Sequence, residues 1–148
     1  MKRLGIKKFY LYLIHGPNPN IPLKETMRAM NYLIENGLAD HIGVSNFVSE
    51  QIFEAQSVSK YKIVNNQIHY NLAARAHEVK GTLDYCRAND VLITVVKSSD
   101  VNHLRENLDA LGWKLESEDE KHLDDNFPRG DTMSVGVSLK AILNPNLK

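Results

Sequence analysis

Four polar side chains of this 148-residue chain follow or end apolar runs of strand length. His15 follows the first run, Ser45 and Asn46 end the second, and Gln67 lies near the end of the third. Barrels of parallel strands carry their binding groups at the carboxyl ends of the strands. The four residues therefore form a candidate binding surface, although each also suits a plain role in a strand or turn.

Lys97 and Ser98 indicate the chemistry of a possible ligand. They immediately precede a segment of helical period that Asp100 can cap. A helix N-terminus beside a cation is a natural phosphate site. The pair is therefore a candidate phosphate-binding site, and the alternative is a solvated lysine beside a helix start.

Metal and disulfide chemistry are not expected. The other histidines lack ligand-like spacing with cysteines or carboxylates. They are His41, His69, His77, His103 and His122. The single cysteine, Cys86, is interpreted as a core thiol, and the absence of a possible intramolecular disulfide fits a reducing cytoplasm.

The composition is that of one soluble domain over residues 1–148. Lys plus Arg number 18 and Asp plus Glu number 18, so we expect neither nucleic acid nor a membrane as a partner. No stretch approaches the ~18 apolar residues of a membrane span. Periodicity fades from about residue 128, which predicts an irregular tail.

Apolar runs alternate with segments of helical period, a pattern typical of parallel βα units. Strands are expected at residues 9–14, 41–45, 61–69 and 91–96, and the unbroken apolar run 9–14 predicts burial on both faces. A doubly wound sheet normally carries a glycine-rich phosphate turn, and none is present. The predicted fold is therefore α/β, a partial, half TIM-type (β/α)8 barrel of about four parallel βα units.

Several helix features are also predicted. Met27, Met30, Leu33 and Ile34 share one helical face, and Gly37 stands where a C-terminal cap belongs. Ser49 is the expected N-cap of the next helix, residues 77–88 a single third helix, and Ser117 with Glu120 a capping box.

Five short motifs arrive in the order found in aldo-keto reductases. They are Leu11–Pro17, Gly43–Phe47, Asn66–Gln67, Lys97–Ser99 and Leu104–Leu108. On these motifs the chain resembles the C-terminal half of an aldo-keto reductase barrel, up to about Pro128. The resemblance implies reduction of small carbonyl substrates with NADP(H), in which a tyrosine acid is tuned by a lysine that an aspartate holds. His15 matches the histidine that orients the carbonyl.

The resemblance also implies cofactor contacts. Ser45, Asn46 and Gln67 match residues that hydrogen-bond the nicotinamide carboxamide, and Lys97 and Ser98 match residues that hold the 2′-phosphate. Asn107 belongs to the last cofactor-side motif, and His103 occupies a position where many members place an adenosine-binding arginine.

Two departures from the family pattern put activity in doubt. The chain begins at what looks like the family's fourth strand, so the tetrad aspartate, tyrosine and lysine are expected to be absent; neither Tyr12 nor Tyr70 matches the tyrosine. The run 91–96 leads directly into Lys97, which indicates that the seventh and eighth strands are fused by an internal deletion. The pyrophosphate-binding loop and the stacking aromatic residue are then missing, and Gly16 replaces a bulky aromatic residue.

Half a barrel leaves two open sheet edges and an exposed inner face. Two copies could close as a homo-oligomer, a complementing half-barrel chain could supply the rest, or the chain could be a poorly folding remnant. The functional hypotheses are an NADPH-dependent carbonyl reductase, weak or inactive as an isolated chain, and a non-catalytic half-barrel that binds dinucleotide weakly or serves in assembly.

Overall fold

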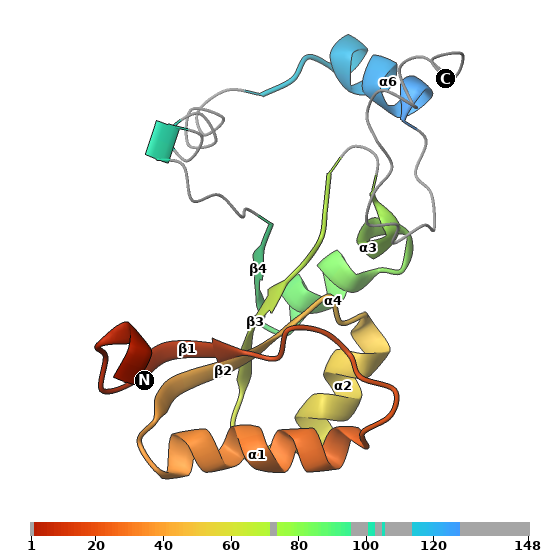
Figure 1. Ribbon diagram of the computed structural model, residues 1–148. Coiled ribbons are helices and arrows are strands. Elements are labelled where there is room, and N and C mark those ends of the chain that lie inside the picture. The colour runs from red at the N-terminus through yellow and green to blue at the C-terminus, as the bar shows by residue number, and fades with distance from the viewer. Residues whose placement is uncertain (1, 72–73, 96–100, 103–104, 106–113, 128–148) are drawn as a thin grey trace, which may run out of the picture.

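A computed structural model of the chain describes residues 2–71, 74–95, 101–102, 105 and 114–127. Its strands are β1 (Phe9–Leu13), β2 (Ala39–Ser45), β3 (Ile63–Gln67) and β4 (Leu92–Thr94). Its helices are η1 (Lys2–Leu4), α1 (Leu23–Glu35), α2 (Ser49–Val58), α3 (Ala76–Val79), α4 (Thr82–Ala88) and α6 (Ser117–Asn126). The strands form one parallel sheet in the order β1-β2-β3-β4 (Figure 1), which confirms the predicted βα alternation.

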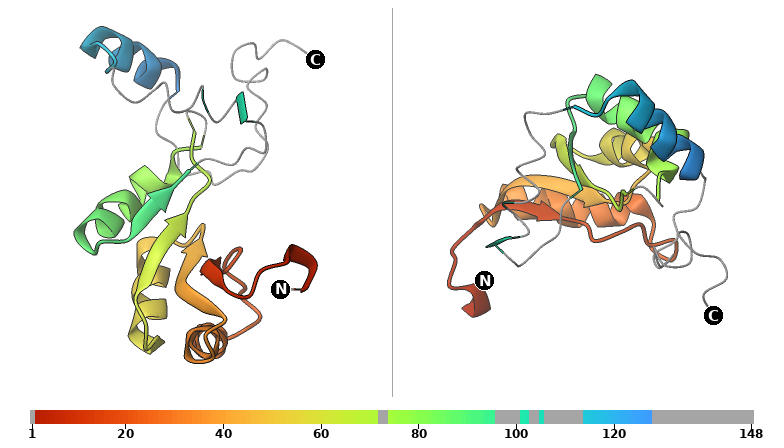
Figure 2. Two further views of the ribbon diagram at one scale, coloured as in Figure 1. Left: turned by 90° about the vertical axis from the view of Figure 1, so that its left-hand side faces the viewer. Right: turned by 90° about the horizontal axis from the view of Figure 1, so that it is seen from above.

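The helices α1, α2 and α4 cover one side of the sheet, as Figures 1 and 2 both show. The core lies between these helices and the sheet. Its buried members are Met27, Met30, Ile42, Val44, Phe47, Ile52, Ala55, Ile63, Cys86 and Val91. Removal of this apolar surface from water is the main force that holds the βα units together. Cys86 is a core thiol as expected, and burial raises its pKa.

The end of α1 sets the direction of the chain into β2. Gly37 adopts a φ of 64°, a left-handed conformation that glycine tolerates without strain. The Leu38 N–H donates to the Leu33 carbonyl at 2.8 Å, and the Gly37 N–H donates to the Ile34 carbonyl at 2.9 Å. This is the hydrogen-bond pattern of a Schellman cap, so the predicted role of Gly37 is confirmed.

Gly43 allows close packing on the sheet face that the helices leave uncovered. A Cβ at this position would lie 2.5 Å from Leu13 Cδ2 and 2.7 Å from the Asn65 carbonyl oxygen. Leu13 and Asn65 therefore fill the space above the middle of β2. We call this side of the sheet the inner face.

The prediction that the first strand is buried on both faces is wrong. Tyr10 is 75% exposed and Tyr12 is 40% exposed, whereas Phe9, Leu11 and Leu13 are half-buried. Within the described residues β1 pairs with β2 alone, so it is an edge strand with incomplete cover. An apolar run therefore indicated a strand correctly but not how many neighbours the strand has.

The expected single helix over residues 77–88 is two helices. Gly81 has a φ of 64° and separates α3 from α4, which starts the chain on a new helical axis. Val79 is consequently exposed and does not share the buried face of Cys86, contrary to the sequence prediction.

Both predicted N-caps are misplaced by one residue. Ser49 and Ser117 are the first residues inside α2 and α6, and the N-cap positions belong to Val48 and Glu116. In α2 the Gln51 side chain instead accepts a hydrogen bond from the Val48 N–H at 3.0 Å, which satisfies one end of the helix without a serine.

The expected tail from residue 128 and the proposed strand fusion beyond Val95 lie outside the described residues. Among the helices that the structure describes, none is long and apolar enough to span a membrane.

Candidate functional site

His15 lies just beyond the carboxyl end of β1. The N–H of the preceding residue, Ile14, donates to the Gly43 carbonyl at 3.0 Å and extends the pairing of β1 with β2 by one residue. Backbone pairing thus fixes the position of His15 relative to β2. Its side chain is exposed to solvent.

Ser45 and Asn46 connect the carboxyl ends of β2 and β3. The Ser45 hydroxyl donates to the Gln67 carbonyl at 2.8 Å, and the Asn46 N–H donates to the same carbonyl at 2.9 Å. Asn46 Oδ1 accepts from the His69 N–H at 2.6 Å, and its Nδ2 donates to Ser45 Oγ at 3.3 Å. These contacts support the plain interpretation of Ser45 and Asn46 as strand-ending residues.

The local backbone explains why asparagine suits position 46. Its φ of 57° lies in the left-handed region, where asparagine is enriched among residues that carry a side chain. The Asn46 amide has one N–H and one oxygen lone pair beyond the contacts described above. Asn46 can therefore stabilise the turn and still contact a ligand.

Gln67 ends β3 and is half-buried. Its backbone carbonyl accepts the hydrogen bonds from Ser45 and Asn46, and Gln67 is one of the residues that line a cavity, to which it can offer its side-chain amide. That amide offers both a donor and an acceptor in one plane, which matches the hydrogen-bonding groups of another amide.

A cavity of about 570 Å³ joins the predicted residues at this end of the sheet. It is lined by His15, Ser45, Asn46, Gln67, Ile68, His69, Tyr70, Asn71 and Val95. The structure therefore brings together four predicted site residues that are up to 52 positions apart in the sequence. It places them where parallel α/β folds carry their binding groups.

Sequence reasoning missed three polar residues of this cavity, His69, Tyr70 and Asn71. They follow Gln67 directly, so their position after a strand end was the signal that could have identified them. Tyr70 has a raised pKa, first because it is partly buried and then because it hydrogen-bonds Glu78. The phenol is therefore kept protonated and is not tuned toward proton release near neutral pH.

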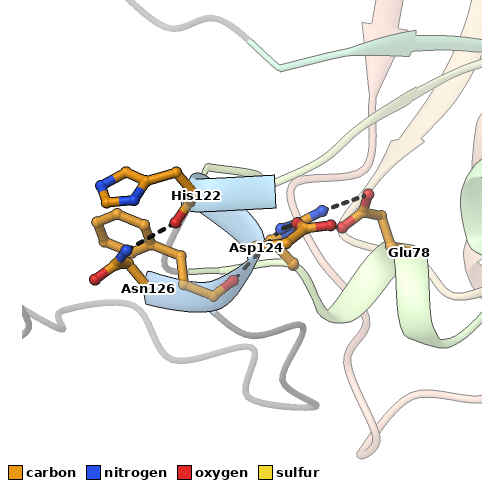
Figure 3. Close-up of polar contacts among 6 residues, drawn as sticks. Glu78, His122, Asp124 and Asn126 are labelled. Atoms are coloured by element: carbon orange, nitrogen blue, oxygen red, sulfur yellow. Dashed lines mark hydrogen bonds and ion pairs between the residues drawn. The ribbon is translucent and has the colours of Figure 1, made fainter. Parts of the chain in front are cut away.

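Glu78 belongs to an ion-pair network that attaches α6 to α3. Arg75 contacts Glu78 through two nitrogens, with Nε to Oε2 at 2.5 Å and Nη2 to Oε1 at 3.2 Å. Its third contact is from Nη1 to Asp124 Oδ1, and the Arg75 side chain is only 10% exposed. Figure 3 shows Asp124 of α6 and Glu78 of α3 close to each other. The two carboxylates raise the pKa of Arg75.

A neighbouring cavity of about 490 Å³ lies between this network and the strand ends. Tyr70 and Asn71 line both cavities, and Leu115, Leu123 and Glu120 contribute from the α6 side. The position of α6 therefore shapes the surroundings of the candidate site.

The remaining candidates, Lys97, Ser98, His103 and Asn107, lie outside the described residues, so their cofactor contacts stay predictions. Across the part of the chain that the structure describes, no group of three or more histidine, cysteine, aspartate or glutamate side chains could hold a metal ion.

The strand order and the cavity at the carboxyl ends define a protein of the α/β barrel class. The profile of the Aldo/keto reductase family matches residues 1–96, and the chain belongs to this family. The four parallel strands with their helices are thus part of a (β/α)8 barrel, as predicted.

Curated relatives share about a third of their matched residues with this chain. An aldo-keto reductase of Bacillus subtilis is 35% identical over 91 residues, which are 62% of this chain and 27% of the relative. A probable voltage-gated potassium channel subunit beta of Oryza sativa is 37% identical over 84 residues, which are 54% of this chain and 25% of the relative. The match thus spans about a quarter of these relatives' length.

Solved structures extend the similarity in space. A thermostable aldo-keto reductase in complex with the inhibitor epalrestat has a TM-score of 0.73 and 34% identity, over 84% of this chain and 62% of that one. An aldo-keto reductase of Klebsiella pneumoniae in complex with NADPH has a TM-score of 0.73, over 93% of this chain and 65% of that one. Its identity with this chain is 21%, so this similarity supports the fold alone.

Proposed function

We propose that this chain is the cofactor-binding, C-terminal half of an aldo-keto reductase barrel and that its cavity binds the nicotinamide end of NADP(H). The observation that carries the proposal is the cavity of about 570 Å³ that His15, Ser45, Asn46 and Gln67 line together. When bound, NADPH would supply the hydride for carbonyl reduction.

The residues present fit a nicotinamide carboxamide. The Gln67 side chain can donate to the carboxamide oxygen and accept from its NH2 group. Asn46 retains one N–H and one lone pair, and Ser45 Oγ retains a lone pair after its contacts with Gln67 and Asn46. Lys97 and Ser98 would hold the 2′-phosphate, and His103 and Asn107 would contribute to the adenosine side.

His15 would orient the carbonyl of a small aldehyde or ketone by a hydrogen bond from its ring. Catalysis also needs the aspartate, tyrosine and lysine of the family tetrad, which we infer this chain does not provide. The raised pKa of Tyr70 argues against Tyr70 as a substitute acid. A relative supports this reaction class, since an NADPH-dependent alpha-keto amide reductase of Saccharomyces cerevisiae is 30% identical over 98 residues.

Reductase activity is tested by NADPH oxidation with a panel of small aldehydes and ketones, comparing the chain with His15→Ala. The control is His122→Ala, because His122 is exposed on α6 and does not line the cavity. A rate above background that His15→Ala lowers and His122→Ala preserves supports catalysis. Background rates in all three proteins show that the isolated chain does not catalyse the reaction, and equal rates above background show that His15 has no part in it.

The second candidate function is a non-catalytic half-barrel. The exposed His15 favours it, since a site that stays open to water lacks the advantages that exclusion of water gives to catalysis. The similarity to a potassium channel subunit beta fits a role in assembly as well. An NADPH titration followed by fluorescence distinguishes a half-barrel that retains a cofactor site from one that serves in assembly alone. Saturable binding that Gln67→Ala weakens and Asn20→Ala leaves unchanged supports a residual cofactor site. The absence of binding supports an assembly role.

A further inference from the structure

Each outer strand of the described sheet has one neighbour and one open side. Within the described ranges, β1 pairs only with β2, and β4 pairs only with β3. Natural edge strands are usually protected by charged residues, proline or bulges. The edge sequences Phe9–Leu13 (FYLYL) and Leu92–Thr94 (LIT) contain no charge and no proline. Within the described residues, the outer side of each edge strand has no strand partner and is suited to pair with a further parallel strand.

The inner face next to these edges is also incompletely covered. Leu92 is 65% exposed there, and Tyr10 on the other edge is 75% exposed. A groove of about 280 Å³ runs across this face and is lined by Tyr10, Leu11, His41, Val64, Asn65 and Leu92. The helices α1, α2 and α4 cover the opposite face (Figure 2), so the groove is where the second half of a barrel interior would pack.

We propose that a second copy of this chain occupies this face and closes an eight-stranded barrel. The described sheet has four strands, half the number in a (β/α)8 barrel. A half turn about the barrel axis keeps every strand direction unchanged. It brings β1 of each copy beside β4 of the other in a parallel arrangement, so both junctions form at once and no edge remains.

Other arrangements of two copies leave more backbone hydrogen-bonding groups of the edge strands unpaired. A sandwich with the inner faces in contact would cover the groove but leave all four edge strands unpaired. Electrostatics does not oppose association, because the formal net charge of each copy is zero at pH 7.

Closure would also enclose the candidate site. The axis is parallel to the strands, so the carboxyl ends of all eight strands share one end of the barrel. His15 and Val95, which follow the two edge strands, would each meet the other copy's strand ends at a junction. The exposed His15 would then be enclosed by the partner copy.

Light scattering coupled to size-exclusion chromatography tests the proposal on the full chain. The expected mass is about twice 16.8 kDa at a protein concentration on the order of 100 μM, and it should fall toward 16.8 kDa on dilution. Leu92→Lys places an ammonium at the junction and should raise the dissociation constant by about tenfold or more. Tyr10→Lys, at the other side of the same junction, should do the same.

The matched control is Phe53→Lys, because Phe53 is 66% exposed but lies on α2, away from both edges. It should keep the dimer, and far-UV circular dichroism should show that all three variants remain folded. A mass of 16.8 kDa at every concentration would overturn the proposal. So would a dimer that Leu92→Lys and Tyr10→Lys leave unchanged while both remain folded.

Discussion

The two faces of the sheet differ in how completely their side chains are removed from water. On the helix side Ile42, Val44 and Ile63 are fully buried beneath α1 and α2. On the inner face Leu92 is 65% exposed, and a groove crosses the strands. The helix side thus supplies the stability of the isolated chain, whereas the inner face and the strand ends are available for a ligand or a second polypeptide.

The largest expected loss of stability comes from a substitution in the helix-side core. Ile42→Ala should reduce the free energy of unfolding by about 2–5 kcal/mol, since it leaves a cavity in a fully buried site. Leu92→Ala should change it by less than about 0.5 kcal/mol when measured on dilute monomer. Urea unfolding followed by circular dichroism compares the two, and equal losses would contradict the difference between the faces.

A smaller effect is expected where α6 joins the rest of the molecule. Arg75→Ala removes a nearly buried guanidinium from two carboxylates and should cost about 1–3 kcal/mol. Arg87→Ala is the matched control, because its pair with Asp84 is 76% and 83% exposed and should cost no more than about 0.5 kcal/mol. Urea unfolding measures both, and a cost for Arg75 as small as that for Arg87 would show that the network does not hold α6.

The smallest effect concerns a buried histidine on α3. His77 is 1% exposed, and neither ring nitrogen has a partner among the described residues. Burial lowers its pKa, and the charges of Lys80 and His69 contribute in the same direction. As the pH falls below 6.5, the usual pKa of histidine, His77 therefore takes up a proton more readily in the unfolded chain than in the folded one. Stability is complete above that value and decreases as the pH falls below it.

The measurement is the urea midpoint from about pH 7.5 to about pH 5.5. His77→Met should reduce the acid-induced loss, because the substitution removes the titrating group. His122→Met, at an exposed position on α6, should preserve the loss. An acid-induced loss of the same size in His77→Met and the wild-type chain would exclude His77 as its source.

The sequence predicted the fold well where local pattern and tertiary structure agree. β-Branched runs and the Gly37 cap marked strands and a helix end correctly, because both depend on a few neighbouring residues. The prediction that the first strand is buried on both faces was wrong, because the exposure of Tyr10 depends on which elements pack beside β1. The break at Gly81 was missed because glycine inside a helical pattern does not reveal its own φ.

The candidate site was predicted in part. His15, Ser45, Asn46 and Gln67 share a cavity because parallel strands bring their carboxyl ends to one edge. Sequence could not show that the Ser45 hydroxyl and the Asn46 amide already bind Gln67 and His69, since these contacts depend on the pairing of β2 and β3. Nor could it reveal the network of Arg75 and Asp124, which lie 49 residues apart.

An NMR titration of the ¹⁵N-labelled chain with NADPH tests whether the strand-end cavity binds the nicotinamide of NADP(H). If it does, the Gln67 and Asn46 side-chain amides and the His69 to Asn71 backbone should show saturable shifts. The amides of Met27 and Ile52, in the helix-side core, should remain unchanged. No shift at Gln67 and Asn46 at saturating NADPH, or shifts confined to other residues, would show that the nicotinamide does not bind in this cavity.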